Sequence, residues 1–412
     1  MINYISKQLK IDTRYIIREG FWMSVAQLAS VASAFATTIV FANLLSENAF
    51  GTYRYLLGIG SVFAVLSLSG MSSSTLQATA KGIPGYVIQG IKIQLRYDSF
   101  AYLAGVSTAL YYYTQSDAQL ALGILIVTLL LPFHNSLQNI FSYLEGKKDY
   151  RLASLFHTLK TAAVTVATLI TLFLTHNILV ILLIYLGTQV LTNLCVFLYS
   201  RPTTVTNSNR LIDNKYLSYA KHTSIRNIIS TISTKADTLL IFQNLGAREL
   251  AIFSLANILP EQIKNQFKNL ARLLVPKYVA YDKPHIIQKN ILMRSVQLLC
   301  FSLFITAAYI LFVPFLYRLF LPNYPEAIFL SQITALAFPA MIAIIPMSAL
   351  QAQHRERELH AINSIGSIIT LLLSFVLILS SGLLGASIAK VLSRYCFTIL
   401  SFYFLYTTRN KT

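Results

Sequence analysis

Charged side chains inside long apolar runs are the residues of this chain most able to do chemistry. Only Asp237 and Glu261 are anionic, whereas the cations are Lys160, Lys235, Lys264, Lys268, Arg272, Lys390 and Arg394. On insertion scales each such charge costs about 2.5–3.5 kcal/mol at the centre of a bilayer. Seven cations against two anions leave a surplus of five, which internal pairing cannot neutralise. The pattern predicts either side chains that snorkel to the headgroups or a hydrated cavity for an anionic guest.

Depth along the expected helices separates these two interpretations. With a rise of about 1.5 Å per residue, Lys264, Lys268 and Arg272 lie roughly 20, 27 and 33 Å from the outer end of one helix, in a single stripe. We favour cavity lining for Lys264 and snorkelling for Arg272, and Lys268 fits both interpretations equally. Pro260 predicts a kink just above this stripe.

Two further cations lie near the expected midplane. Arg394 is roughly 16 Å into the last apolar run, with Lys390 one turn outward on the same face. Lys235 is similarly deep in the seventh run, and Asp237 falls on the other side of that helix, so these two cannot pair directly. We expect Lys160 to snorkel to the headgroups and interpret Arg54 as an interfacial anchor, with a place at the rim of a cavity as the alternative.

Features of enzymes are missing from the sequence. It has no nucleotide-binding glycine loop, no metal-ligand spacing and no carboxylate pair in an outward loop. The cysteines Cys195, Cys300 and Cys396 stand singly in apolar runs and are assigned to packing. The chain is therefore interpreted as a non-enzyme without a metal site.

The elements that carry these charges are transmembrane helices. The 412 residues are 55% hydrophobic and only 12% charged, about half the charged fraction of a soluble protein. Runs of about 20 apolar residues, enough to cross a bilayer, predict an all-α integral membrane protein of about 12 transmembrane helices. The predicted spans are 21–44, 53–76, 99–113, 120–143, 153–175, 178–199, 224–245, 251–276, 293–316, 327–350, 362–381 and 383–406.

Basic residues in the loops predict the orientation of these helices. Most of the 33 lysines and arginines fall in alternate loops and in both terminal segments, whereas the opposite loops hold only Arg54, Arg248 and Arg318. Because cytoplasmic loops are enriched in Lys and Arg, both termini are expected in the cytoplasm. The net charge of +18 is then a topology signal, and no nucleic-acid partner is expected.

A polar segment near the middle divides the chain in two. We expect an N-terminal six-helix bundle at 1–200, a cytoplasmic linker at 201–223 and a C-terminal six-helix bundle at 224–412, around a central cavity. Phe41 and Asn43 recur as Phe242 and Asn244, 201 positions later. An offset of six spans predicts parallel repeats, a common plan of transporters with a substrate site between the halves.

Several motifs resemble the polysaccharide biosynthesis flippases, the Wzx-type members of the multidrug, oligosaccharidyl-lipid and polysaccharide exporter superfamily. FANLLSENAFGTYRYL at 41–56 is similar to that family's turn between the first and second helices. KADTLLIFQNLGARELAIFSLANIL at 235–259 is similar to its seventh-to-eighth segment, although Ala251 and Phe253 replace the family's glycine and tyrosine. YLEGKKDYRLAS and ALQAQHRERELHA resemble its two equivalent inner loops.

This resemblance implies transport of an undecaprenyl-diphosphate-linked oligosaccharide across the bacterial inner membrane, for O antigen, lipopolysaccharide or capsule. Its partners would be the polyprenyl-diphosphate-linked oligosaccharide, membrane lipids and other polysaccharide-assembly membrane proteins. The phosphates need Lys or Arg donors. The expected substrate-binding residues are Lys264, Arg394 and Lys235, supported by Lys268 and Lys390, and Asp237 is expected to act in ion coupling or structure.

No cofactor is expected, and a proton or sodium gradient is left open as the energy source. A lipid II flippase of the same superfamily would be expected to have fourteen spans, whereas this sequence predicts twelve. A cation-coupled multidrug exporter would hold acidic groups for cationic drugs. A membrane polymerase or glycosyltransferase of the same pathway would carry a large outward catalytic loop. These remain the alternatives.

Overall fold

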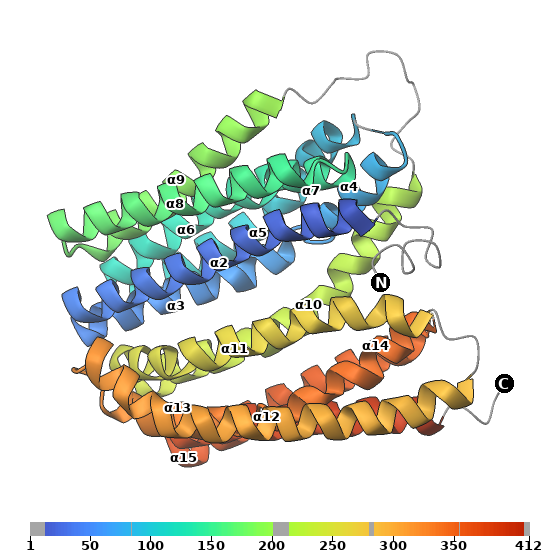
Figure 1. Cartoon of the computed structure of the whole chain (residues 1–412). Coiled ribbons are helices and arrows are strands. Elements are labelled where there is room, and N and C mark those ends of the chain that lie inside the picture. The colour runs from blue at the N-terminus through green and yellow to red at the C-terminus, as the bar shows by residue number, and fades with distance from the viewer. Residues whose placement is uncertain (1–12, 84, 201–213, 280–283, 354, 408–412) are drawn as a thin grey trace. The chain divides into compact units, whose positions relative to one another are not determined.

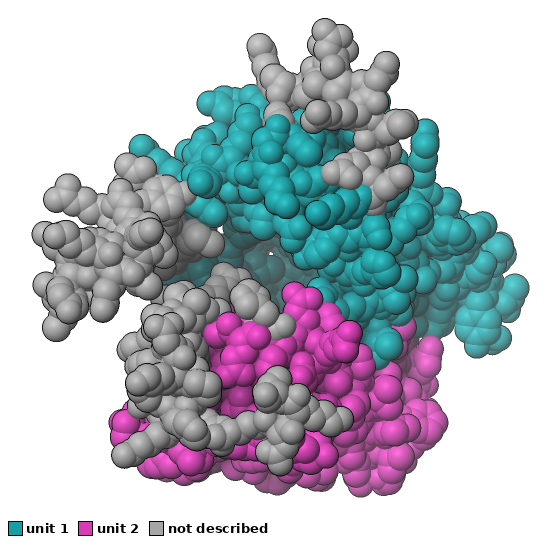
Figure 2. Space-filling model, turned by 90° about the vertical axis from the view of Figure 1, so that its right-hand side faces the viewer, with its two compact units in different colours: residues 1–231 teal, residues 232–412 magenta. Residues whose placement is uncertain are grey.

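The protein consists of helices throughout the part that the structure describes. The computed structural model describes residues 13–83, 85–200, 214–279, 284–353 and 355–407, and within these the side chains of all but 13–26, 214 and 268–290. Eight segments of these residues are long and apolar enough to cross a membrane, and the last of them, Glu356–Thr407, is long enough for two passes. The prediction of an all-α membrane protein is confirmed. The chain divides into two compact units, residues 1–231 and 232–412 (Figure 2).

Unit 1 is a bundle in which consecutive helices return alongside one another (Figure 1). The helices α5 and α6, α8 and α9, and α2 and α8 pack against each other. The start of α10 also belongs to this unit. The bounds are α2 Thr13–Leu44, α3 Glu47–Leu66, α4 Met71–Ala80, α5 Tyr86–Thr114, α6 Ala118–Leu137, α7 Asn139–Gly146, α8 Tyr150–Leu174, α9 Ile178–Ser200 and α10 Asn214–Leu245.

Short polar side chains cap the N-termini of several of these helices. The Ser46 hydroxyl accepts a hydrogen bond from the Ala49 amide at 3.3 Å. Asp117 and Asp149 cap α6 and α8 in the same way, through the amides three residues on. Each cap satisfies an amide that has no partner within its helix, and so fixes where the chain turns back into the bundle.

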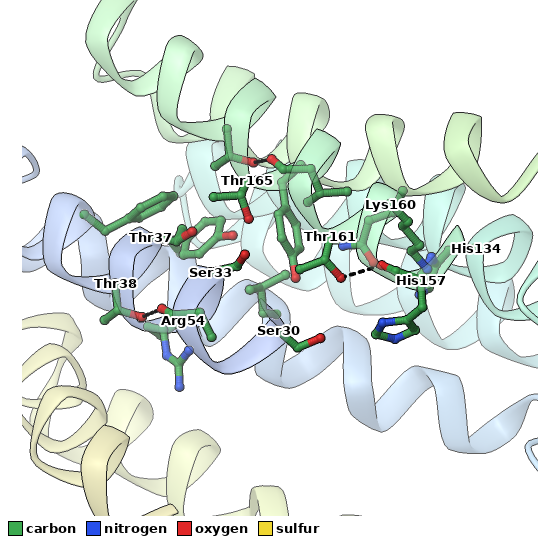
Figure 3. A pocket seen from close by; sticks show the side chains of 18 of the residues that line it. Ser30, Ser33, Thr37, Thr38, Arg54, His134, His157, Lys160, Thr161 and Thr165 are labelled. Carbon is green, nitrogen blue, oxygen red and sulfur yellow. Dashed lines mark hydrogen bonds between the residues drawn. The ribbon is translucent and has the colours of Figure 1, made fainter. Parts of the chain in front are cut away.

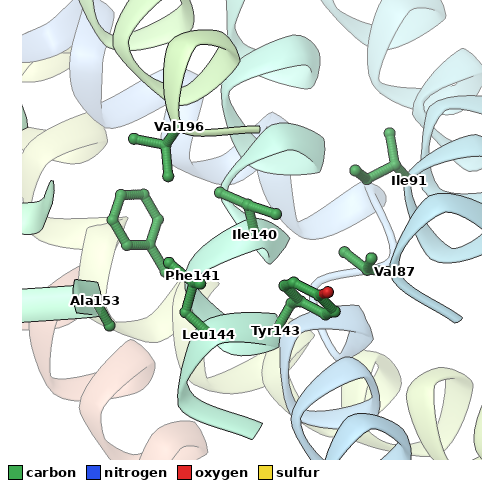
Figure 4. Close-up of a cluster of buried hydrophobic side chains, with 8 residues drawn as sticks. All are labelled: Val87, Ile91, Ile140, Phe141, Tyr143, Leu144, Ala153 and Val196. Atoms are coloured by element: carbon green, nitrogen blue, oxygen red, sulfur yellow. The ribbon is translucent and has the colours of Figure 1, made fainter. Parts of the chain in front are cut away.

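A hydrophobic cluster holds α7 against its neighbours (Figure 4). Ile140 and Tyr143 are fully buried, and they pack with Val87 of α5 and Val196 of α9. Burial of these apolar side chains holds the short helix α7 against α5, α8 and α9.

Unit 2 contains the remaining helices and one interrupted span. The predicted span 327–350 is broken at Pro339, where a short 3₁₀ helix replaces the α-helix, as a missing backbone donor favours. The bounds are α11 Ala247–Val279, α12 Pro284–Phe320, α13 Glu326–Ala335, η1 Pro339–Ala343, α14 Ile344–Ala352 and α15 Glu356–Thr407.

Two glycines with positive φ make the tight turns of this unit. Gly246, with φ of 102°, joins α10 to α11, and its amide donates to the carbonyls of Ile241 and Phe242. Gly382, with φ of 59° and ψ of −133°, folds α15 back on itself. The two halves of α15 then lie side by side, since a methyl group at Gly366 would meet the ring of Phe397. The predicted break between spans 362–381 and 383–406 coincides with this turn.

Gly246→Ala is expected to lower the free energy of unfolding by about 1–3 kcal/mol, because an L side chain is strained at this φ. Gly187→Ala is the matched control. Gly187 lies within α9 with open space around it, so alanine there is expected to be neutral or slightly stabilising. Thermal unfolding of both purified variants measures the difference, and an equal response of the two would contradict the assigned role of the turn.

Several helices extend well beyond the predicted spans. Helix α5 begins at Tyr86 rather than at residue 99, and α10 begins at Asn214 rather than at residue 224. Hydropathy detects only the apolar part of a helix, and the extensions carry polar and basic residues. As a result, Asp98 falls inside a long helix, which the sequence analysis did not foresee. The predictions for the termini and the segment 201–213, and those for the side chains of Lys268 and Arg272, lie outside the described residues.

Candidate functional site

The two glycine turns bring three helices of unit 2 together at one depth. The turns are neighbours, since a methyl group at Gly382 would lie 3.8 Å from the side chain of Leu245, beside Gly246. Asp237 is nine residues before Gly246, Asn257 eleven after it, and Lys390 eight after Gly382. At about 1.5 Å per residue, all three lie roughly 12–17 Å from the turns.

Lys390 is the centre of this arrangement. Its ammonium Nζ is 3.2 Å from Asp237 Oδ2 and donates a hydrogen bond to Asn257 Oδ1 at 3.1 Å. It is also 4.0 Å from Glu261 Oε1 and 4.8 Å from the centre of the Phe253 ring. The Asp237 side chain is only 10% exposed and that of Lys390 25%. A lysine with two carboxylates, an amide oxygen and an aromatic face around it is held in place by charge and cation–π attraction.

A second pair lies one turn along α11. Lys264, 11% exposed, forms an ion pair with Glu261, so this carboxylate contacts two lysines. Arg394, one turn beyond Lys390 on α15, lies close enough to interact electrostatically with Glu261 and Lys264. Within the described residues, Arg394 itself has no carboxylate within 4 Å and its side chain makes no hydrogen bond. The cluster of Lys264, Lys390, Arg394, Asp237 and Glu261 therefore has a net charge of +1. Arg394 is its uncommitted donor, meaning the cation whose hydrogen-bond donors no described residue accepts.

The structure thus brings together Lys264, Lys390, Arg394 and Asp237 from the predicted set. Lys235 is half-buried on the same helix as Asp237, two residues earlier. Asn257, whose side-chain oxygen accepts a hydrogen bond from Lys390, was not predicted, and neither was the identity of the lysine that pairs with Asp237 from a neighbouring helix. Helical periodicity shows which residues share a face of one helix, but it does not identify the helix opposite.

Unit 1 has a pocket of its own, of about 370 Å³, between α2, α3, α6, α8 and α9 (Figure 3). The volume is within the range of small-molecule sites. Lys160 lines the pocket with its Nζ 5.5 Å from the centre of the Phe141 ring, and Arg54 lies at its edge. The structure therefore places Lys160 in a pocket, where we expected snorkelling, and Arg54 in the alternative position considered for it.

Two histidines add hydrogen-bonding groups to this pocket. The Asn193 side-chain nitrogen donates to the backbone carbonyl of His134 at 3.1 Å and lies 3.3 Å from His134 Nδ1. Because a carbonyl only accepts, this nitrogen must be the amide donor, so Nδ1 is the accepting nitrogen of the ring. His157 lies one turn before Lys160 on α8.

Hydroxyl groups complete the lining. Thr161 and Thr168 donate to the carbonyls four residues earlier in α8. Ser33, Thr37 and Thr165 have hydroxyls without a hydrogen-bond partner among the described residues, and those of Ser33 and Thr165 point into the pocket in Figure 3. The polar residues of α2 and α8 recur every three or four positions, a signal that was available in the sequence.

The chemistry of the pocket follows from this lining. It offers ammonium, guanidinium, imidazole and hydroxyl groups, and none of the residues that line it is an aspartate or glutamate. Such a surface suits a guest that combines negative charge with many hydroxyl groups and disfavours a cationic guest.

Comparison with known proteins identifies the family. Residues 16–276 match the polysaccharide biosynthesis protein family. The chain belongs to this family. A comparison with curated protein sequences finds no significant match.

Solved structures of similar fold are transporters of the MOP superfamily. The lipid II flippase MurJ, in an inward closed conformation, has a TM-score of 0.72 at 14% identity, over 92% of this chain and 86% of that one. An inward-facing multidrug resistance MATE family transporter has a TM-score of 0.70 at 14% identity, over 92% and 97%. A MOP superfamily transporter from Pyrococcus furiosus has a TM-score of 0.65 at 14% identity, over 95% and 94%. At this identity the likeness concerns the fold.

Proposed function

We propose that this protein is a flippase for an undecaprenyl-diphosphate-linked oligosaccharide. It moves the glycan headgroup from the cytoplasmic to the periplasmic leaflet of a bacterial inner membrane by alternating access, for surface polysaccharide such as O antigen or capsule. Membership of a polysaccharide biosynthesis family and a fold similar to that of a lipid II flippase support this function. Both termini would lie in the cytoplasm, and other polysaccharide-assembly membrane proteins would supply and receive the glycan.

The observation that carries the proposal is the character of the polar sites inside the helical units. Arg394 is an uncommitted guanidinium within a cluster of net positive charge, and the pocket of unit 1 presents cations and hydroxyls without a carboxylate. A diphosphate needs charged donors, and sugars need hydroxyl and amide partners. The proposed substrate carries both a diphosphate and sugars in one headgroup, so it needs both kinds of partner.

Within this proposal the predicted residues take different roles. Arg394 is the main phosphate donor, with Lys264, Lys235, Lys268 and Lys390 adding positive potential and further donors. Asp237 has a structural role, because its contact with Lys390 holds that lysine toward Asn257 and Glu261. Lys264 and Lys390 share Glu261, so either lysine can turn to a phosphate while the other keeps the carboxylate neutralised.

A multidrug exporter of the same fold is the nearest alternative. A cationic drug would meet like charge in the pocket of unit 1, which costs affinity. In the cluster around Lys390 it would find the carboxylates of Asp237 and Glu261 already paired with lysines. A membrane polymerase or glycosyltransferase of the pathway that used a carboxylate aligned on a sugar donor would find none in the pocket lining, where the imidazoles of His134 and His157 are the groups able to accept a proton.

Lys160→Met is expected to reduce glycan transport by about 10-fold or more, because one charge-assisted hydrogen bond to the headgroup, worth about 1.5–3 kcal/mol, is lost. Lys147→Met is the control, since Lys147 is an exposed residue that contacts Tyr143 outside the pocket. Both variants are expected in the membrane at wild-type levels. Surface polymer measured against protein abundance separates them, and equal polymer in the two variants would remove Lys160 from the site.

The proposed function is tested by deleting the gene and analysing the lipid-linked glycan. Surface polymer is expected to disappear while undecaprenyl-diphosphate oligosaccharide accumulates on the cytoplasmic leaflet, and the wild-type gene is expected to restore both. Normal surface polymer in the deletion strain, with no second family member in the genome, would contradict the flippase function.

A further inference from the structure

One end of the pocket in unit 1 gathers three basic side chains. His134 of α6 and His157 and Lys160 of α8 line this end, and Figure 3 shows the three close together. The Lys160 Nζ lies 5.5 Å from the centre of the Phe141 ring, and the centre of the His157 ring lies 5.9 Å from that same point. Lys160 also lies close enough to both histidines to interact with them electrostatically. The ammonium group therefore has two imidazoles as neighbours.

Lys160 has no anionic partner at this end of the pocket. Among the described residues, no carboxylate oxygen lies within 4 Å of its Nζ, and its ammonium group makes no hydrogen bond. An unpaired charge between transmembrane helices is costly and commonly marks the path of a substrate. A neutral sugar would leave this ammonium without a counter-charge, whereas an anionic group on the guest would supply one.

The charge at this end matches one carboxylate better than a diphosphate. An imidazole with an ordinary pKa is largely neutral at pH 7, so Lys160 supplies about one positive charge. Arg54 lies at the opposite end of the pocket, with the hydroxyls of Ser33 and Thr165 between the two ends (Figure 3). A diphosphate carries more than one negative charge, and it is already assigned to Arg394, which belongs to unit 2.

We propose that the transported glycan contains an acidic sugar and that the Lys160 end of this pocket binds the sugar's carboxylate. The ammonium group donates a charge-assisted hydrogen bond to the carboxylate, and the imidazoles of His134 and His157 are further hydrogen-bonding groups beside it. The hydroxyls of Ser33 and Thr165, which point into the pocket, bind hydroxyl groups of the same guest. The inference rests on the proposed flippase function and adds to its substrate a second anionic group, distinct from the diphosphate.

The lipid-linked glycan that accumulates in the deletion strain provides the first test. Its sugar composition is determined, and a sugar with a carboxylate is expected. A glycan of neutral sugars alone would overturn the proposal.

Transport of two matched substrates tests the role of Lys160. One is the acidic glycan on undecaprenyl diphosphate, and the other is a synthetic analogue in which a primary alcohol replaces the carboxylate. In proteoliposomes, wild-type protein is expected to transport the acidic form about 10-fold faster, because the analogue loses one charge-assisted hydrogen bond. Lys160→Met is expected to transport both forms at similar rates. Lys147→Met is expected to keep the preference, and Arg394→Gln to slow both forms by the same factor.

Direct binding separates a failure of this inference from a failure of the proposed function. The acidic oligosaccharide and its alcohol analogue, both without lipid and diphosphate, are added to the purified full-length chain during thermal unfolding. The acidic form is expected to raise the unfolding temperature saturably, and the analogue to need about a tenfold higher concentration for half the rise. This preference without any transport would refute the flippase function and retain the carboxylate site.

Two results would overturn the carboxylate site. One is equal binding of the acidic oligosaccharide and its analogue by the wild-type protein, a comparison that needs no variant to fold. The other is an equal preference for the acidic form in wild-type protein and in Lys160→Met, which would assign the carboxylate to other residues.

Discussion

Arg394→Gln is expected to reduce glycan transport about 100-fold while leaving the protein folded and inserted. A factor of 100 corresponds to about 2.8 kcal/mol, which is the free energy expected for the loss of a bidentate arginine contact to a phosphate. Folding is expected to change little, because within the described residues the Arg394 side chain has neither an ion pair nor a hydrogen bond to lose. Removing its charge also relieves repulsion with Lys264. The measurement is transport per molecule together with the unfolding temperature.

Two further variants serve as controls for the loss of transport expected in Arg394→Gln. Arg394→Lys keeps the charge but not the planar fork of donors, so transport is expected at an intermediate level. Arg357→Gln removes an exposed arginine from the start of the same helix and is expected to transport as the wild type does. Full transport by Arg394→Gln would remove this residue from the substrate site. A large fall in its unfolding temperature would assign it a structural role instead.

Lys390→Met is expected to destabilise unit 2 strongly, by about 3 kcal/mol or more. The change leaves the carboxylate of Asp237, only 10% exposed, without its cation and leaves Asn257 Oδ1 without its donor. Breaking a buried pair from one side costs about 3–5 kcal/mol, and the partial exposure of Lys390 places the expectation at the lower end of that range. Thermal unfolding of the purified variant measures the loss.

The double variant Lys390→Met/Asp237→Asn is expected to recover much of this stability, since it removes both members of the pair. Glu261 keeps Lys264 as its partner in that variant. A double variant no more stable than Lys390→Met alone would show that the two residues are not coupled and would refute the pairing. Recovery of stability without recovery of transport would show that Lys390 also serves the substrate.

Much of the fold was predictable from local patterns in the sequence. Apolar runs of spanning length predicted an all-α membrane protein, and the predicted break between spans 362–381 and 383–406 falls at Gly382. The depth of Lys264, Lys390 and Arg394 along their helices was also predictable, because the rise per residue is constant. These features depend on a few neighbouring residues and not on how distant helices pack.

The contacts between helices were not predictable in the same way. Asp237 and Lys390 are 153 positions apart, and their ion pair depends on the rotation of α10 and α15 about their axes. The pocket of unit 1 was missed for another reason. Hydroxyls in apolar helices commonly donate to the backbone of their own helix, as those of Thr161 and Thr168 do. The row of polar residues along α8 therefore did not show whether its hydroxyls line a pocket or only bond to their own helix.

Translocation in proteoliposomes shows directly whether this protein moves the glycan headgroup between leaflets. Purified protein and an undecaprenyl-diphosphate oligosaccharide are reconstituted together, and a membrane-impermeant glycan-modifying reagent reports the fraction of headgroups in the outer leaflet over time. We expect rapid exchange between leaflets with wild-type protein and little more than the protein-free rate with Arg394→Gln. Exchange at the protein-free rate with folded wild-type protein under imposed proton and sodium gradients, or equal exchange by the wild type and Arg394→Gln, would contradict it.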